Sequence, residues 1–223
     1  MIRQDRCAMK VCTDSCILGA WTAKRLEGRN KILDIGTGTG LLPLMLAQKS
    51  NAGIDTIESD IDSSLQAGEN IRQSPWKNQI HQIQGDARLH LFNQSYDFII
   101  TNPPFFESGL QSPDQKKNKA KHDQSLTLDE LMPIFGSCLK KDGLFSILLP
   151  FYRTDYFELL SSSGGFFLKE KLIVRQTAAH KPFRSICLYS FQKPLHVLLE
   201  EINIKDERGK YSVAFSELMS DYY

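Results

Sequence analysis

Short apolar runs and stretches with helical periodicity alternate along most of the chain. An apolar run bounded by turn residues predicts a buried strand, and apolar residues three or four positions apart predict a helix that packs on the sheet. The predicted strands are residues 31–35, 54–58, 80–84, 98–101, 144–149, 166–174 and 185–191. The predicted helices are residues 15–27, 41–48, 61–72, 128–139 and 152–160.

The lengths of the connections predict how these strands run. Strands that are separated by helices are expected to be parallel, whereas the short connection between the last two strands predicts an antiparallel pair. The sequence therefore predicts an α/β sandwich with a seven-stranded, mostly parallel sheet and an antiparallel last strand pair. We expect one domain over residues 1–223, in which residues 1–28 form an N-terminal cover segment and helix. Residues 211–218 in the polar tail fit either an edge strand or a short helix.

Composition excludes several classes of protein. With 41% hydrophobic and 24% charged residues and a formal net charge of +1, the chain is not strongly basic, so any nucleic-acid contact must come from a local patch. No apolar run approaches the roughly 20 residues that span a bilayer, and no secretory signal opens the chain, which predicts a cytoplasmic protein. We expect it to act as a monomer. Cys7, Cys12 and Cys16 lie close together, but their spacing matches no metal-ligand signature, so we expect no bound metal.

Glycines recur between the first predicted strand and its helix, after an aspartate. Asp34 is followed by Gly36, Gly38 and Gly40, and glycines at such a junction let the backbone turn tightly and approach a ligand. The third glycine comes one residue too early for a dinucleotide fingerprint, and the Lys-Ser/Thr of a P-loop is missing. An acid before the glycines suits a ligand with an amine or a cationic centre. The pattern D-x-G-x-G-x-G is typical of S-adenosylmethionine binding.

The next two strands end in acidic residues that would extend this cofactor site. Glu58 ends the second strand, where an acid reaches ribose hydroxyls in an open α/β sheet. Asp60 is the rival for that role, but its place before a helix favours an N-cap. Asp86 follows the third strand and could accept a hydrogen bond from the exocyclic amine of the cofactor's adenine, or simply form a turn.

The fourth strand is followed directly by Asn102, Pro103, Pro104 and Phe105. Two prolines cannot continue a central strand, because they lack the N–H that a ladder needs, so the chain must turn there. The turn presents an amide side chain, rigid backbone carbonyls and aromatic rings, which could hold a planar group that carries an amine. Cofactor groups on three strands and a reacting site on the fourth would then share one edge of the sheet.

Two basic segments are candidates for contact with nucleic acid. Residues 106–125 lack apolar periodicity, and loops of that length are usually functional lids or disordered. This loop holds several lysines beside the aromatic, base-sized site after the fourth strand, and it is either a solvated mobile loop or a phosphate contact. The connection of residues 175–184 is either a second phosphate contact or a polar hairpin tip. The candidate substrate-binding residues in these two segments are Phe106, Lys116, Lys117, Lys119, Lys121, Lys181 and Arg184.

The chain resembles the class I S-adenosylmethionine-dependent methyltransferases, and among them the N6-adenine enzymes with the N/D-P-P-Y/F motif. The opening QDRCAMKVCTD, followed by LGAW, further resembles the bacterial tRNA1(Val) (adenine(37)-N6)-methyltransferase family. The resemblance implies S-adenosylmethionine as cofactor, tRNA as partner, and methylation of the N6 amine of adenosine 37, which is immediately 3′ of the anticodon. It also implies that Thr13 and Asp14 border the methionine end of the cofactor and that Lys10 contacts the cofactor or the RNA. Two glycines expected from the family are Cys12 and Ser15 here, and if those glycines matter through a positive φ, the local backbone differs.

Three other functions stay open. A protein-glutamine N5-methyltransferase also uses N-P-P-Y/F, but such enzymes carry a sizeable helical domain before the glycine loop, and only 33 residues precede Asp34. Methylation of a guanine exocyclic amine in ribosomal RNA is closer in chemistry. A non-enzymatic RNA-binding module that kept the fold would bind S-adenosylmethionine without transferring its methyl group to any RNA.

Overall fold

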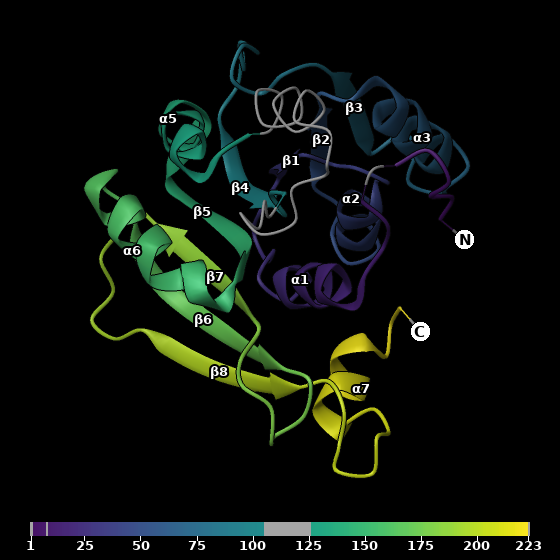
Figure 1. Cartoon of the computed structure of the whole chain (residues 1–223). Helices are drawn as coiled ribbons and strands as arrows, with labels where there is room; N and C mark the ends of the chain where they lie inside the picture. Colours follow the sequence, from purple (N-terminus) through teal and green to yellow (C-terminus); the bar gives the residue numbers. More distant parts are fainter. Residues whose placement is uncertain (1, 8, 105–125, 223) are drawn as a thin grey trace, which may run out of the picture.

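One sheet organises the described part of the chain, which the computed structural model gives as residues 2–7, 9–104 and 126–222. Its strands lie in the order β3-β2-β1-β4-β5-β7-β6-β8 (Figure 1). The strands β1 to β5 run parallel, β7 is antiparallel to both β5 and β6, and β8 is parallel to β6. The predicted α/β fold and its antiparallel pair, β6 and β7, are confirmed. The strands are β1 (Lys31–Ile35), β2 (Gly53–Glu58), β3 (Ile80–Gln84), β4 (Tyr96–Thr101), β5 (Leu139–Pro150), β6 (Phe167–Arg175), β7 (Arg184–Ser190) and β8 (Leu198–Asn203).

The prediction of seven strands is wrong by one, because β8 extends the sheet beyond β6. This edge strand has no apolar alternation that would reveal it. Leu198 and Leu199 are 53% and 63% exposed, and Ile202 is its buried apolar residue. A strand that is paired along one side and covered on little of its surface buries too few side chains to leave a clear pattern.

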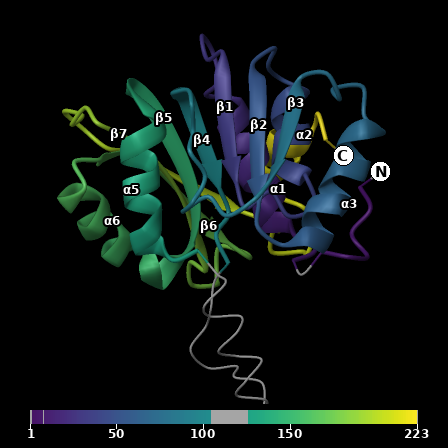
Figure 2. The ribbon, with the colours of Figure 1, turned by 90° about the horizontal axis from the view of Figure 1, so that it is seen from above.

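Helices cover both faces of the sheet (Figure 2). Buried residues of α5 and α6 pack with one face of β1, β4, β5 and β7, whereas those of α1, α2 and α7 pack with the other face, together with Ile71 of α3. The two apolar layers together form the core that a doubly covered sheet requires. The helices are α1 (Thr13–Ala23), α2 (Leu41–Ala47), α3 (Ile61–Arg72), α5 (Leu128–Cys138), α6 (Thr154–Ser163) and α7 (Val213–Met219), with a short 3₁₀ turn, η1 (Phe151–Arg153).

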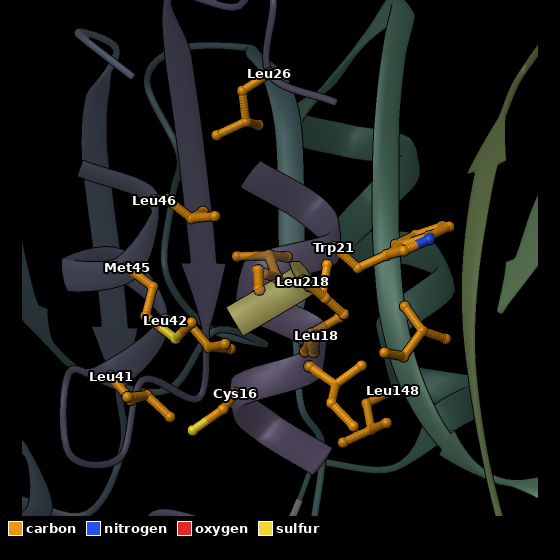
Figure 3. Packing of buried hydrophobic residues seen from close by; sticks show 14 of the residues in the cluster. Cys16, Leu18, Trp21, Leu26, Leu41, Leu42, Met45, Leu46, Leu148 and Leu218 are labelled. Atoms are coloured by element: carbon orange, nitrogen blue, oxygen red, sulfur yellow. The ribbon is translucent and has the colours of Figure 1, made fainter. Parts of the chain in front are cut away.

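The first helix packs tightly against α2 and against the sheet. Leu18 and Trp21 of α1 lie in the same buried cluster as Met45 of α2 (Figure 3). At Gly19 an added Cβ would stand 2.7 Å from the Met45 sulfur, so glycine is needed for the close approach of the two helices. This packing fixes the start of α1 next to the end of β4, where the candidate site begins.

Several elements differ from the predictions. Helix α1 begins two residues before the predicted start and ends at Ala23 instead of residue 27, and its N-cap is Cys12. Strand β5 begins at Leu139, five residues before its predicted start, so that the polar residues 140–142 belong to a strand. The ambiguous tail forms a helix, α7, whose cap is the Ser212 hydroxyl that accepts a hydrogen bond from the Phe215 amide.

The topology brings four loops to one edge of the sheet. The chain leaves β1, β2, β3 and β4 at their carboxyl ends, and the strand order reverses between β1 and β4. In open α/β sheets, ligands bind at such a reversal, outside the carboxyl ends of the strands. In the part of the chain that the structure describes, no helix is long and apolar enough to cross a membrane.

Candidate active site

The loop after β1 forms an open backbone cradle. Gly36, Gly38 and Gly40 have φ angles of +77°, +54° and +79°, in the left-handed region that favours glycine. The Gly36 amide donates to the Ile57 carbonyl, which ties the loop to β2. A Cβ added at Gly36 or Gly38 would meet no atom within 4 Å. The protein therefore requires these glycines for their backbone angles, and it leaves the space beside them free for a ligand.

Asp34 lies beneath this cradle with its carboxylate buried. The residue is 0% exposed, and neither carboxylate oxygen has a hydrogen-bond partner among the described residues. Burial raises the pKa of this carboxyl to about 7, although the nearby Thr37 hydroxyl acts against the rise, and the charge of Glu58 adds to it. An acid this poorly satisfied suits a ligand that brings a hydrogen-bond donor or a positive charge.

Glu58 stands at the end of β2 and braces the glycine loop. One carboxylate oxygen, Oε2, accepts a hydrogen bond of 2.9 Å from the Gly38 amide, and Oε1 accepts one of 3.0 Å from the Asp60 amide. The Asp60 side chain accepts a hydrogen bond of 2.8 Å from the Ser63 amide, which makes it the N-cap of α3. The capping interpretation of Asp60 is thus confirmed, and the contact of Glu58 with the ribose stays a prediction.

Asp86, after β3, has a partner that the sequence reasoning missed. The Arg88 guanidinium donates to both Asp86 oxygens at 2.6–3.0 Å and also pairs with Glu130 of α5 at 3.0 Å. Hydrogen bonds from Arg88 hold the pKa of the Asp86 carboxyl below its usual range. The close spacing of Asp86 and Arg88 was a local signal for this pair. The expected contact of Asp86 with the cofactor's adenine stays a prediction.

Asn102 follows β4 with its amide held in one orientation. Its nitrogen, Nδ2, donates to the Ser15 hydroxyl at 2.9 Å and lies 3.6 Å from the sulfur of Met9. Its oxygen, Oδ1, is buried and has no hydrogen-bond partner among the described residues. Pro103 is buried and Pro104 is exposed. Within the described ranges, the Asn102 amide oxygen is therefore still available as an acceptor at the reversal point of the sheet.

Asp14 and Arg184 meet although they are 170 residues apart. The Arg184 side chain donates from Nε to an Asp14 oxygen at 2.8 Å, which ties the first turn of α1 to the start of β7. Asp14 is 9% exposed and Thr13 is half-buried beside it. The family resemblance implies a cofactor role for Asp14, and Arg184 is a candidate for phosphate contact; the structure places the two side chains in contact.

The other substrate candidates are exposed or lie outside the described residues. Lys10 is exposed, as is Lys181, which lies in the connection between β6 and β7. Because β7 is antiparallel to β5, this connection is at the same edge of the sheet as Asn102. The candidates that fall outside the described residues are Phe105, Phe106, Lys116, Lys117, Lys119 and Lys121.

The N-terminal cysteines form no metal centre within the ranges that the structure describes. Cys7 and Cys16 are buried, Cys12 is half-buried, and none of the three is joined in a disulfide. No group of three or more histidine, cysteine or acidic side chains is placed there to hold a metal ion. At Cys12 the φ angle is −131°, and in the same ranges every residue with a positive φ is a glycine. The family's glycines at positions 12 and 15 are therefore replaced without a left-handed backbone.

Comparison with known proteins identifies the family. A relative from Dyadobacter fermentans, named tRNA1(Val) (adenine(37)-N6)-methyltransferase, is 40% identical over 226 residues, which cover 100% of this chain and 93% of the relative. A relative of the same name from Bacteroides fragilis is 36% identical over 98% of this chain and 92% of its own. The chain belongs to this family. The methyltransferase small domain family also matches residues 16–120.

Solved structures agree with the fold of this methyltransferase family. A crystal structure from Agrobacterium tumefaciens, described as that of a predicted O-methyltransferase, has a TM-score of 0.67 over 93% of this chain and 95% of its own. At 14% sequence identity, the likeness extends to the fold alone. The resemblance seen in the opening segment and in the N-P-P-F motif is thus confirmed by full-length relatives.

The methyl donor of the family, S-adenosylmethionine, fits the residues that are present. The Asp34 carboxylate, which has no hydrogen-bond partner in the part of the chain that the structure describes, suits a cofactor with an amine and a sulfonium, and the cradle over Gly36 and Gly38 leaves room for it. Glu58 would hold the ribose, Asp86 the adenine, and Thr13 and Asp14 the methionine end. When bound, S-adenosylmethionine supplies an electrophilic methyl group on a cationic sulfur.

The left-handed angle at Gly38 leads to a first prediction. We expect Gly38→Ala to weaken S-adenosylmethionine binding by about tenfold or more, because alanine strains this backbone by about 1–2 kcal/mol and adds a methyl group on the ligand side. Titration calorimetry measures the affinity. The matched control is Gly209→Ala, which changes a glycine at φ +76° with equally open space in a turn before α7. Equal affinities of the two variants would contradict the role of the cradle.

Proposed function

We propose that the chain transfers a methyl group from S-adenosylmethionine to the N6 amine of adenosine 37 in tRNA1(Val), as the names of its relatives indicate for those proteins. The chemistry rests on Oδ1 of Asn102, which is buried and has no hydrogen-bond partner among the residues that the structure describes, while Nδ2 is already engaged. Such an oxygen can only accept, and a nucleobase amine offers the donor.

The proposed reaction needs acceptors rather than a strong base. The lone pair of an adenine amine is conjugated with the ring, which makes the nitrogen a poor nucleophile. If Asn102 Oδ1 and the Pro103 carbonyl each accept one N–H bond of this amine, the nitrogen moves toward tetrahedral geometry and its lone pair becomes available to the methyl group. A new N–C bond forms as the S–C bond breaks, and the amine then loses a proton to water. The two prolines hold these acceptors rigidly, so little reorganisation is needed during the reaction.

The substrate has to present an unstacked base. A base in the anticodon loop is easier to extrude than a paired one, which favours a tRNA loop over a duplex. We assign base stacking to Phe105 and Phe106, and contact with phosphates to Lys10, Lys181 and Arg184 and to the four lysines of residues 106–125. We further propose that the chain acts in the cytoplasm as a single-domain monomer.

The decisive experiment offers the purified protein radiolabelled S-adenosylmethionine together with bulk tRNA, bulk ribosomal RNA or total protein. Nucleoside analysis then identifies the labelled group. We expect label in tRNA as N6-methyladenosine. Label in N2-methylguanosine of ribosomal RNA or in protein glutamine would keep the fold and cofactor but overturn the substrate. Cofactor binding without transfer to any of them would favour a non-enzymatic RNA-binding module.

The position of Lys181 leads to a prediction about tRNA binding. We expect Lys181→Ala to raise KM for tRNA about threefold with kcat unchanged, because a single exposed phosphate contact contributes to affinity but not to chemistry. The control is Lys193→Ala, which removes another exposed lysine from the connection after β7, at the opposite edge of the sheet. Steady-state kinetics at two salt concentrations measure both variants. A KM that changes equally in both variants would contradict a specific contact at Lys181.

A further inference from the structure

We propose that Ser15 is a positioning residue, whose hydroxyl turns the Asn102 amide so that Oδ1 rather than Nδ2 faces the substrate amine. This inference rests on the function proposed above, in which Asn102 accepts a hydrogen bond from that amine. It assigns a role to a serine at a position where the family resemblance leads one to expect glycine.

The two ends of an asparagine amide have nearly the same shape but opposite hydrogen-bonding properties. Nδ2 can only donate and Oδ1 can only accept. If the amide of Asn102 were reversed, its NH₂ group would face the NH₂ group of the base, and two donors would oppose each other. The orientation of this side chain therefore decides whether the site can bind and activate an amine at all.

Ser15 supplies the contact that distinguishes the two orientations. Its Oγ lies 2.9 Å from Asn102 Nδ2, and the residue is only 5% exposed, so water competes little for this hydrogen bond. Met9 also lies near Nδ2, but at 3.6 Å its sulfur is a weak acceptor on a side chain that is 39% exposed. The serine hydroxyl is the stronger partner.

The position of the Ser15 hydroxyl is itself fixed. Ser15 lies in the first turn of α1, and its amide donates to an Asp14 oxygen at 3.1 Å. Its Oγ also lies 2.9 Å from the sulfur of Cys12. Because Asn102 Nδ2 donates to Ser15 Oγ, the serine can give its own hydrogen to Cys12 or accept a second one from the thiol. Either arrangement keeps Oγ in place as an acceptor for Asn102.

The test compares a variant that lacks the Ser15 hydroxyl with a variant that lacks another buried hydroxyl, which also contacts α1. We expect Ser15→Ala to lower kcat for methyl transfer to tRNA about tenfold, with the S-adenosylmethionine affinity and KM for tRNA within twofold of wild type. The control is Ser146→Ala on β5, which breaks a buried hydrogen bond of 2.9 Å to Thr22 of α1, away from Asn102. We expect it to lower the melting temperature and to leave kcat unchanged.

A second background tests whether Ser15 acts through the orientation of the amide. In Asn102→Asp both outer atoms are oxygens, so the orientation no longer matters, and Ser15→Ala should then lower the remaining kcat less than twofold. A tenfold loss in both backgrounds overturns the inference. So does a kcat loss no larger than that of Ser146→Ala, or an equal loss of cofactor affinity.

The same assays separate this inference from the proposed function. If wild type forms no N6-methyladenosine in tRNA, the proposed function fails. If wild type forms it and Ser15→Ala forms it equally fast, the inference alone fails. Should Asn102→Asp be too slow to measure, the comparison of kcat between Ser15→Ala and Ser146→Ala decides the question.

Discussion

Replacing Asn102 by alanine is expected to lower the rate of methyl transfer by about 10³-fold while leaving S-adenosylmethionine affinity within about twofold of wild type. The variant removes the acceptor that draws the amine toward tetrahedral geometry. It leaves Asp34, the glycine cradle and Glu58 untouched, and these are the groups assigned to the cofactor. The two effects should therefore separate cleanly.

Single-turnover methyl transfer and calorimetric titration of the cofactor measure the two effects independently. Asn203→Ala is a matched control, because Asn203 also ends a strand and has a buried Oδ1 without a hydrogen-bond partner among the described residues. It lies on β8, four places from β4 in the sheet, so its variant should keep full activity. If Asn102→Ala lost cofactor affinity and transfer to the same extent, its side chain would be a structural support for the cofactor site instead of the acceptor for the amine.

The features that could be predicted from the sequence depend on residues that are close together in the chain. The glycines after Asp34 predict a tight turn, and the N-P-P-F motif predicts the end of a central strand. The capping role of Asp60 followed from its place before a helix. In each case the physical cause acts within a few residues, so local pattern and chemistry agree.

Two of the missed contacts join segments that are distant in the sequence. Ser15 and Asn102 are 87 positions apart, and Arg88 reaches Glu130 across 42 positions. The local sequence does not indicate such partners. Ser15 and Asn102 meet only when α1 packs on the sheet, and Arg88 and Glu130 meet only when α5 packs beside the loop after β3. The eighth strand was missed for a different reason. It is an exposed edge strand, so too few of its side chains are buried to produce an apolar alternation in the sequence.

The buried carboxylate of Asp34 should make the stability of the ligand-free protein depend on pH. Folding raises the pKa of this acid from 3.8 to about 7, so between these values the folded state binds a proton that the unfolded state has released. Stability contributed by this group is therefore lost as pH rises from about 4 to 7. Asp34→Asn removes this titrating group. The free energy of unfolding of the variant, relative to that of wild type at the same pH, should therefore be about 2–3 kcal/mol higher at pH 8 than at pH 5.

Binding of S-adenosylmethionine should show the reverse dependence. If the ligand is bound by the ionised carboxylate, a pKa of about 7 makes wild-type affinity rise about tenfold between pH 6 and pH 8, as the proton leaves. In Asp34→Asn the affinity should be weaker at pH 8 and lack this rise. Since the ligand's own amine titrates identically in both experiments, the difference between the two proteins isolates Asp34.

Chemical denaturation and calorimetry of both proteins over this pH range measure the two linked effects. The same proton that stabilises the ligand-free fold at low pH must be released when the cofactor binds, so a gain in stability for Asp34→Asn and a loss of its pH-dependent affinity should appear together. Parallel stability curves for the two proteins would show that Asp34 does not titrate between pH 5 and pH 8. A variant that binds S-adenosylmethionine as tightly as wild type would remove Asp34 from the cofactor site.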